Sequence, residues 1–438
     1  MSAYQEVEQY ILDIPRFAGK HTLEDTKKIL RRLIGDKIES KVIHIAGTNG
    51  KGSVCAYLRS VLVESGCSVG MFTSPHLETM RERICLGNEM ISEEDFVATF
   101  DRVLAVCKEV SIKEHQENLH PSFFEFLYLM AMSYYKEKKP DYLILETGLG
   151  GRLDATNSVE KPELCVITEI GYDHMQYLGD TLLEIAEEKA GIIKPFIPVV
   201  FFDKRKEVTK VLKKCAEKQK SQTFIIKKDN ILNVNSGNKT IDFSFETGYY
   251  SYDSLSLSTT ALYQTENAAL AIAAAELLSR ENKQISREAI RKGVQKAFWP
   301  GRMEEIEPGI YFDGAHNEDG IEAFLKTVVG MKCEGRRFLL FGVVSDKRYE
   351  RMIAQIAESG LFTEVAVTIL ESDRSASLDE LRKIWGQYKQ ITCSFHQNAN
   401  EAYHHLLSDR KDADVIYIAG SLYLIAQMKA LVRRKSDD

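Results

Sequence analysis

The sequence has few features that would assign it to a specialised class of protein. Its eight cysteines include no Cys-x-x-Cys pair and follow no framework of spacings, so free thiols in a reducing compartment are expected. The first residues carry no signal-peptide pattern, and no apolar run approaches the length that spans a bilayer. These absences predict a cytoplasmic protein that does not act on a membrane.

Neither the charge nor the composition is extreme. The formal net charge is -7 and the sequence pI is about 5.9, which do not favour wholesale binding of nucleic acid. Hydrophobic residues make up 44% of the chain and charged residues 28%, as in ordinary globular proteins. At 438 residues the chain exceeds what one hydrophobic core usually supports, so we expect two or three domains.

Apolar runs and helical patterns alternate along the chain, which is typical of a parallel sheet covered by helices. In the first part we predict strands at 41–46, 68–75, 141–148 and 163–171, and helices from Ser53, over 123–138, from Thr181 and over 265–280. Residues 225–262 are rich in Thr, Ser, Tyr, Asn and Gly, which indicates a small antiparallel sheet.

A segment with two prolines and two glycines, 298–309, is interpreted as an interdomain joint. After it the alternation restarts, with strands predicted at 309–315, 337–344, 364–370, 391–396 and 414–420, and helices at 378–385 and 422–434. The predicted fold is therefore α/β: an N-terminal P-loop-type ATPase domain with a mostly parallel sheet and a small antiparallel sheet, then a C-terminal Rossmann-like domain.

The stretch "HIAGTNGKGSV" places a glycine-rich turn between a strand and a helix. The unpaired N–H groups and the dipole of a helix N-terminus attract phosphate, and Lys51 can reach the terminal phosphates. The loop departs from the common pattern, because Gly52 separates Lys51 from Ser53 and Ile45 stands where the first glycine is usual. The alternative is a turn that happens to contain three glycines.

Polar residues follow two further strands. Glu146 ends the run "YLIL", where a carboxylate would face the ligand crevice and could bind magnesium beside a nucleotide; the alternative is an acid exposed to water. Asp173 and His174 come just past another strand, which we expect to end at the same edge of the sheet as Gly47 and Glu146.

Lys189 lies on the apolar stripe of the helix that begins at Thr181, in register with Leu182 and Ile185. An unpaired ammonium is costly to bury, so the side chain either snorkels to the edge or enters a charged site.

In the second half, "FDGAHNEDG" places Asp313 and His316 between a strand and a helix, and Arg302 lies in the joint. These are either a helix cap and a surface cation, or a second set of polar groups that closes over a ligand between domains.

These segments together resemble the folylpolyglutamate synthase and dihydrofolate synthase family, within the Mur ligase group. The resemblance covers nearly the whole chain and rests on ordered motifs: "HIAGTNGKGSV", "TSPHL", "ETGLGGRLDATN", "ITEIGYDHMQYLGDTLLEIAEEKAGIIKP", "ENAALAIAA", "WPGRME", "FDGAHN", "FGVVSDK" and "AGSLYL". It implies an ATP-binding central domain with the folate site at 1–298, and a C-terminal Rossmann-like glutamate ligase domain at 299–438.

The resemblance also implies roles for single residues. Those implied to bind ATP are Gly47, Thr48, Asn49, Gly50, Lys51, Gly52, Ser53, Asn267, Arg302 and Asp313. One magnesium ion would be held by Ser74 and Glu146 and a second by His174, and Lys189 would be carbamylated. Catalytic roles fall to Lys51, Lys189 and His316, the last near the phosphate and glutamate. The pterin or folate would be flanked by Ser122, Phe124, Leu153, Asp154 and Ala155.

The activity implied is the ATP-dependent addition of L-glutamate to the terminal carboxylate of tetrahydrofolate, through an acyl phosphate, by a monomer. Whether dihydropteroate is also a substrate stays open. The chain departs from the family pattern at Thr147, at Tyr263, where histidine is frequent, and at Glu318, where proline is common.

Two rival functions remain. A cell-wall Mur ligase would carry an N-terminal domain for its nucleotide sugar, and the 46 residues before Gly47 are too few for one. A nucleotide-dependent switch without ligase activity would bind nucleotide and release no phosphate in response to glutamate.

Overall fold

The large N-terminal sheet brings together strands that are far apart in the chain. The computed structural model describes residues 2–15, 22–113, 120–237 and 239–437. Eight strands lie in the order β4-β3-β2-β5-β1-β6-β7-β8, all parallel except β3 and β4. Their bounds are β1 Lys41–Ala46, β2 Val69–Phe72, β3 Ile84–Leu86, β4 Glu89–Met90, β5 Tyr142–Glu146, β6 Leu164–Ile167, β7 Val199–Phe202 and β8 Thr223–Ile226.

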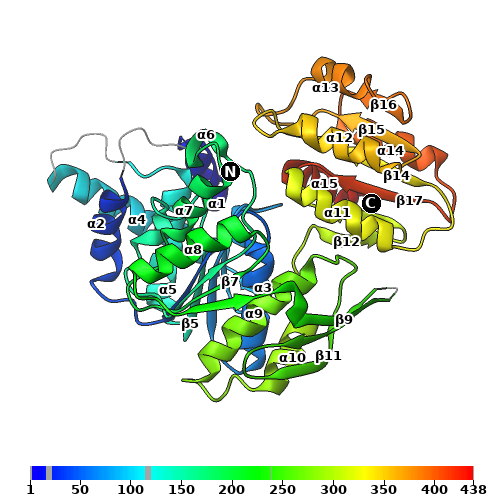
Figure 1. Ribbon diagram of the computed structural model, residues 1–438. Helices are drawn as coiled ribbons and strands as arrows, with labels where there is room; N and C mark the ends of the chain where they lie inside the picture. The colour runs from blue at the N-terminus through cyan, green and yellow to red at the C-terminus, as the bar shows by residue number, and fades with distance from the viewer. Residues whose placement is uncertain (1, 16–21, 114–119, 238, 438) are drawn as a thin grey trace.

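Helices cover both faces of this sheet (Figure 1). One face packs against α3 (Lys51–Glu64) and α9 (Gln264–Ser279), with α10 (Arg287–Lys296) behind α3. The other packs against α1 (Ala3–Asp13), α2 (Leu23–Ile34), α4 (Glu93–Lys113), α5 (Phe123–Lys138), α7 (Leu182–Ala190) and α8 (Lys206–Lys218). Because both faces are covered, strand β1 is buried and apolar from Val42 to Ala46 except at His44, as parallel strands usually are.

A small antiparallel sheet lies beside the large one, as its composition predicted. Its strands β9 (Ile231–Ser236), β10 (Ile241–Glu246) and β11 (Ser251–Leu257) lie in the order β11-β10-β9. Alternate residues of β10 join the core formed by α3 and α9, namely Ile241, Phe243 and Phe245. One detail differs from the prediction, since residues 225–226 belong to β8 at the edge of the large sheet.

The C-terminal lobe, yellow to red in Figure 1, holds a six-stranded sheet in the order β12-β13-β17-β14-β15-β16. The strands are β12 Arg302–Glu307, β13 Ile310–Asp313, β14 Arg337–Phe341, β15 Glu364–Thr368, β16 Thr392–His396 and β17 Val415–Ala419. The helices are α11 Glu318–Gly330, α12 Tyr349–Ser359, α13 Leu378–Trp385, α14 Ala399–Asp409 and α15 Leu422–Asp437. Each predicted strand of this half is present, and the Rossmann-like fold is confirmed.

The joint is shorter than the sequence indicated. Residues 302–307 form β12, which pairs antiparallel with β13 at the free edge of the C-terminal sheet. Residues 297–301, between the end of α10 and the start of β12, connect the two lobes without belonging to a helix or strand. The interpretation of all of 298–309 as a connector was wrong because the prolines and glycines stand only at its two ends, where they bound a strand.

Among the described residues, four short helices lie between the main elements. The short helices are α6 (Met175–Leu178), η1 (Met80–Arg83), η2 (Ala155–Ser158) and η3 (Lys228–Asn230). Within the described ranges, no helix combines the length and apolar character needed to cross a membrane.

Candidate active site

Three neighbouring parallel strands, β5, β1 and β6, end at one edge of the large sheet. The phosphate loop follows β1, Glu146 closes β5, and the segment with Asp173 and His174 follows β6. Ligands of open α/β sheets bind beyond the carboxyl ends of the strands, so the predicted polar residues are brought to one place.

The loop from Gly47 to Ser53 is fixed to the end of β6. Thr48 N–H donates to the carbonyl oxygen of Glu169 at 2.7 Å, and Thr168 Oγ1 donates to that of Asn49 at 2.7 Å. A side chain at Gly47 would overlap the Thr168 hydroxyl, so only glycine fits. Gly50 takes a left-handed conformation at the N-cap of α3, which leaves the first N–H groups of the helix directed at a ligand.

Glu146 is buried beside the phosphate loop, so the alternative of an acid exposed to water was wrong. Its carboxylate accepts the Ser74 N–H at 3.0 Å, and Lys51 Nζ lies 3.9 Å from its other oxygen. Burial raises the pKa of Glu146, and the charges of Lys51, Arg302 and Arg83 oppose that rise. The sequence analysis did not predict a role for Arg83, because the stretch "RERI" after "TSPHL" contains no pattern that identifies this arginine as a site residue.

Lys189 also enters the site, so the reading in which it snorkels to the surface was wrong. Its side chain is buried, and Nζ donates to the carbonyl oxygen of Gly47 at 2.8 Å. Burial lowers its pKa to about 7, with a further contribution from Lys51. At neutral pH a large share of the Lys189 amine is therefore uncharged.

Asp173 gathers cations from both lobes. Its carboxylate forms an ion pair with Lys347 and lies 3.7 Å from His316 Nε2 and 3.8 Å from His174 Nε2. Burial raises the pKa of Asp173, but the neighbouring His316 and the charge of Lys347 outweigh it, so the pKa lies well below its usual range. Burial lowers the pKa of His174 to about 4. Lys347, in "FGVVSDK", was quoted as part of a motif but given no role.

The amides of Asn49 and Asn317 also join the lobes. Asn317 Nδ2 donates to Asn49 Oδ1 at 2.9 Å, and Asn49 Nδ2 donates back to Asn317 Oδ1 at 3.3 Å. Asn317 is the N-cap of α11, so the phosphate loop faces the start of a C-terminal helix.

Asp313 is buried, and its carboxylate has three partners. It accepts from Tyr263 Oη at 2.5 Å, from Ala315 N–H at 2.9 Å and from Met303 N–H at 3.1 Å. Burial raises its pKa, and the charge of Arg302 opposes this. The departure at Tyr263 therefore places a hydroxyl on the carboxylate that the resemblance assigned to ATP.

The next residues of α9 contact the phosphate loop. Gln264 Nε2 donates to Ser53 Oγ at 3.1 Å, and Asn267 Nδ2 donates to Gln264 Oε1 at 2.9 Å. The Asn267 side chain fills the space beside Gly50. The other two departures have simpler settings: Glu318 pairs with Arg348 at 3.0 Å, and Thr147 is buried with no hydrogen-bond partner for its hydroxyl among the described residues.

Of the residues assigned to the folate, those in the loop at 153–155 differ in how far their side chains are exposed to solvent. Asp154 is buried and accepts the N–H groups of Gly148 at 2.9 Å and Leu149 at 2.8 Å, so it shapes the loop. Ala155 is buried, whereas Leu153 is 66% exposed.

The remaining two are on helix α5. Ser122 caps this helix, and the ring of Phe124 lies 5.5 Å from that of Phe72 and fills the space beside Gly148.

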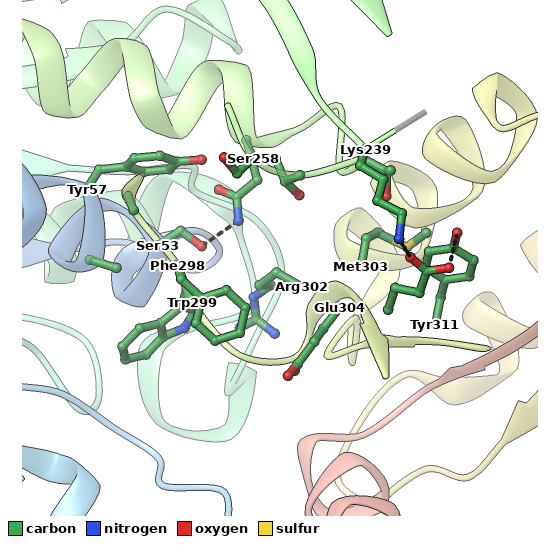
Figure 2. Close-up of a pocket in the computed structure, with 16 residues that line it drawn as sticks. Ser53, Tyr57, Lys239, Ser258, Phe298, Trp299, Arg302, Met303, Glu304 and Tyr311 are labelled. Carbon is green, nitrogen blue, oxygen red and sulfur yellow. Dashed lines mark hydrogen bonds and ion pairs between the residues drawn. The ribbon is translucent and has the colours of Figure 1, made fainter. Parts of the chain in front are cut away.

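Two cavities lie along the joint, of about 270 and about 190 Å³. The larger, shown in Figure 2, lies between α3, residues 258–260 and the start of β12, and the smaller reaches Ser74 and Glu146. Trp299 and Arg302 line both cavities.

Comparisons with known proteins agree with this geometry. Residues 45–275 match the Mur ligase middle domain, and residues 301–422 match the Mur ligase glutamate ligase domain. A Bacillus subtilis (strain 168) protein named dihydrofolate synthase/folylpolyglutamate synthase is 36% identical over 98% of this chain and 99% of its own. The chain belongs to the folylpolyglutamate synthase and dihydrofolate synthase family of Mur ligases. It is an ATP-dependent ligase.

Solved structures of this family share the whole fold. Escherichia coli FolC in complex with DHPP and ADP superposes with a TM-score of 0.86 at 26% identity, over 99% of this chain and 98% of that one. An FPGS–AMPPCP–folate complex gives a TM-score of 0.86 at 27% identity, over 98% of this chain and 99% of that one. The family fold therefore extends over both lobes of this chain.

Proposed function

We propose that this enzyme adds L-glutamate to the terminal carboxylate of a reduced folate, with tetrahydrofolate as substrate and dihydropteroate as a candidate second substrate. One observation carries the proposal: charged residues of both lobes lie together at the phosphate loop. The N-terminal lobe contributes Lys51, Glu146, Asp173 and Lys189, and the C-terminal lobe contributes His316 and Lys347. A relative named for both activities and neighbours that contain ADP, an ATP analogue, DHPP or folate support it.

The phosphate loop would hold ATP, and the joint would hold its remaining parts. The N–H groups at the start of α3 and Lys51 face the phosphates, while Asn267, Arg302 and Asp313 would contact the nucleoside. The folate would lie along Ser122, Phe124 and 153–155. We place the division between the ATP and folate domain and the glutamate ligase domain at 298/299, inside the connecting segment.

The side-chain oxygens of Glu146 and Ser74 suit magnesium, because Mg²⁺ prefers oxygen ligands. When Mg²⁺ also binds phosphate, it usually takes few ligands from the protein. Among the described residues, no three or more His, Cys, Asp or Glu side chains are grouped so that they could hold a metal ion. His174, largely neutral at pH 7, would contact a second ion. The metal would supply positive charge beside the phosphates.

A carbamate fits Lys189, because carbon dioxide adds to a neutral amine and the pKa of this amine is lowered to about 7. The neutral amine would add to carbon dioxide and release one proton to solvent, which leaves an anion beside Lys51 where the protonated amine would be a cation. Carbamylation thereby removes the unfavourable pairing of two cations in one buried site.

The reaction would proceed in two steps. The folate carboxylate attacks the γ-phosphorus of ATP, the bond to ADP breaks, and an acyl phosphate forms. The amine of glutamate then attacks the acyl carbon and phosphate leaves. Lys51 would offset charge that develops on the transferred phosphoryl group, and closure of the lobes through the Asp173–Lys347 ion pair would exclude water.

The test measures phosphate release from ATP with tetrahydrofolate and L-glutamate, each omitted in turn. We expect release to require both, and to fall at least a hundredfold in Lys51→Ala. Nucleotide binding without folate- and glutamate-dependent release would favour the rival switch function. Replacing tetrahydrofolate by dihydropteroate decides whether the second activity is present. Monomeric state and a cytoplasmic location are further parts of the proposal, open to light scattering and cell fractionation.

A further inference from the structure

Gly52, the glycine that interrupts the common phosphate-loop pattern, lies against the indole of Trp299. A Cβ atom at position 52 would lie 2.7 Å from Trp299 Cζ2 and 2.8 Å from Cε2 and Nε1. Real Cβ atoms essentially never come this close to a neighbour. The indole, partly buried against the core under α3, therefore fills the space of a side chain at position 52.

The backbone conformation does not explain this glycine. Gly52 lies in the first turn of α3 and is not among the residues with positive φ. Within a helix, alanine is more favourable than glycine by roughly 1 kcal/mol. The physical reason for glycine at position 52 is thus the space taken by Trp299.

The first residue of β12, Arg302, makes a similar contact directly after the connecting segment. A Cβ atom at Gly314 would overlap Arg302 Nη1 and lie 2.5 Å from Leu422 Cδ2, and Gly314 also lacks a positive φ. Gly314 N–H donates to the carbonyl oxygen of Gly301 at 2.7 Å. The side chains of Trp299 and Arg302 therefore fill the space that a side chain would need at Gly52 in the N-terminal lobe and at Gly314 in the C-terminal lobe.

We propose that Trp299 is a positioning residue for ATP. Its indole packs against the start of α3 and thereby fixes the position of Lys51 relative to the connecting segment. Arg302 packs against Gly314 and fixes the loop after β13. The extra glycine of "GKGS" and the tryptophan of "WPGR" are two halves of one contact (Figure 2 shows Trp299 and Arg302 along the joint, near Ser53). The proposal rests on the ligase function proposed above, since it assigns a residue to the same nucleotide site.

The experiment is a double-mutant cycle on Gly52→Ala and Trp299→Ala. Binding of a non-hydrolysable ATP analogue and thermal unfolding are measured for the wild type, both single variants and the double variant. With Trp299 present, the added methyl group overpacks the contact, and we expect five- to about thirtyfold weaker binding and a lower melting temperature. Without the indole, the same methyl group is accommodated and favours the helix, so Gly52→Ala weakens binding by a smaller factor than in the presence of Trp299 and raises the melting temperature.

The control is Gly330→Ala, a helical glycine whose nearest neighbour, Leu262 Cδ1, would lie at an ordinary 3.5 Å. It should not weaken binding in either background. Trp299→Leu replaces Trp299→Ala if the alanine variant fails to fold. Rate measurements add a second readout: KM for ATP should rise in Gly52→Ala more than kcat falls.

If Gly52→Ala weakens analogue binding by the same factor with and without Trp299, the glycine serves the nucleotide directly and the proposal is wrong. The ligase function stands or falls separately, on glutamate-dependent phosphate release by the wild type. The cycle itself needs only binding and unfolding, so failure of one proposal can be told from failure of the other.

Discussion

Replacing Lys189 by methionine should make the enzyme more stable at low pH while it abolishes activity. Methionine has a similar length and no charge, and the site that Lys189 occupies is fully enclosed. The folded-state pKa of about 7 lies below the ordinary 10.5 of the unfolded chain, so between these values the unfolded chain binds more protons and stability rises with pH. Below pH 7 the full penalty of the buried ammonium applies.

The magnitude follows from the shift of the pKa. A drop from 10.5 to about 7 is about 3.5 pKa units, and at 1.36 kcal/mol per unit the penalty is about 5 kcal/mol at pH 6. The lost hydrogen bond to the Gly47 carbonyl oxygen removes about 1–3 kcal/mol of the gain. The variant should thus be about 2–4 kcal/mol more stable than the wild type at pH 6, and the difference should fall by about 2–3 kcal/mol at pH 9.

Denaturant unfolding of both proteins at pH 6, 7.5 and 9 in carbon dioxide-free buffer measures this directly. Exposed Lys213→Met on α8 is the control and should change stability by under about 0.5 kcal/mol at each pH. A difference between Lys189→Met and wild type that does not vary with pH, or a wild type more stable at pH 6, would refute the assignment of a buried amine. Added bicarbonate should raise the activity of the wild type and leave the inactive variant unchanged.

Three further predictions concern other contacts of the site. Glu146→Gln should lower kcat at least a hundredfold at saturating magnesium without unfolding the protein, and near-normal turnover would remove this carboxylate from the site. Asn317→Ala breaks the amide pair with Asn49, so it should raise KM for ATP several-fold with little change of the melting temperature; an equal rise of KM in the wild type and in the Asn49→Ala background would show that the pair is not coupled. His44→Phe removes the hydrogen bond between His44 Nε2 and the Thr156 hydroxyl, which are 2.8 Å apart, while that hydroxyl keeps its bond to Asp154. The unfolding free energy should fall by about 0.5–1.5 kcal/mol, and an equal loss in His44→Gln would contradict the hydrogen bond as the cause.

Local patterns were sufficient for much of the fold. Helix α5 has the predicted bounds, and α7 follows Thr181 as predicted, with a capping box between Thr181 and Glu184. Strands β3, β4 and β7 were not predicted, nor were helices α1, α2, α4, α8, α10, α12 and α14. The predicted joint was too long because it included β12. Whether such an edge segment forms a strand depends on its pairing with β13 and not on its own residues alone.

For the site, the sequence determined which side chains would gather at the edge of the sheet, because strand ends of a parallel sheet meet there whatever the loops do. It also posed the buried lysine as a question, since helical periodicity shows which face a residue occupies but not what lies opposite. Only the tertiary structure decided that Lys189 reaches the Gly47 carbonyl and that Asp173 pairs with Lys347, 174 positions away in the chain. It alone showed Trp299 in the space beside Gly52, because a close contact between distant segments depends on packing that no local pattern records.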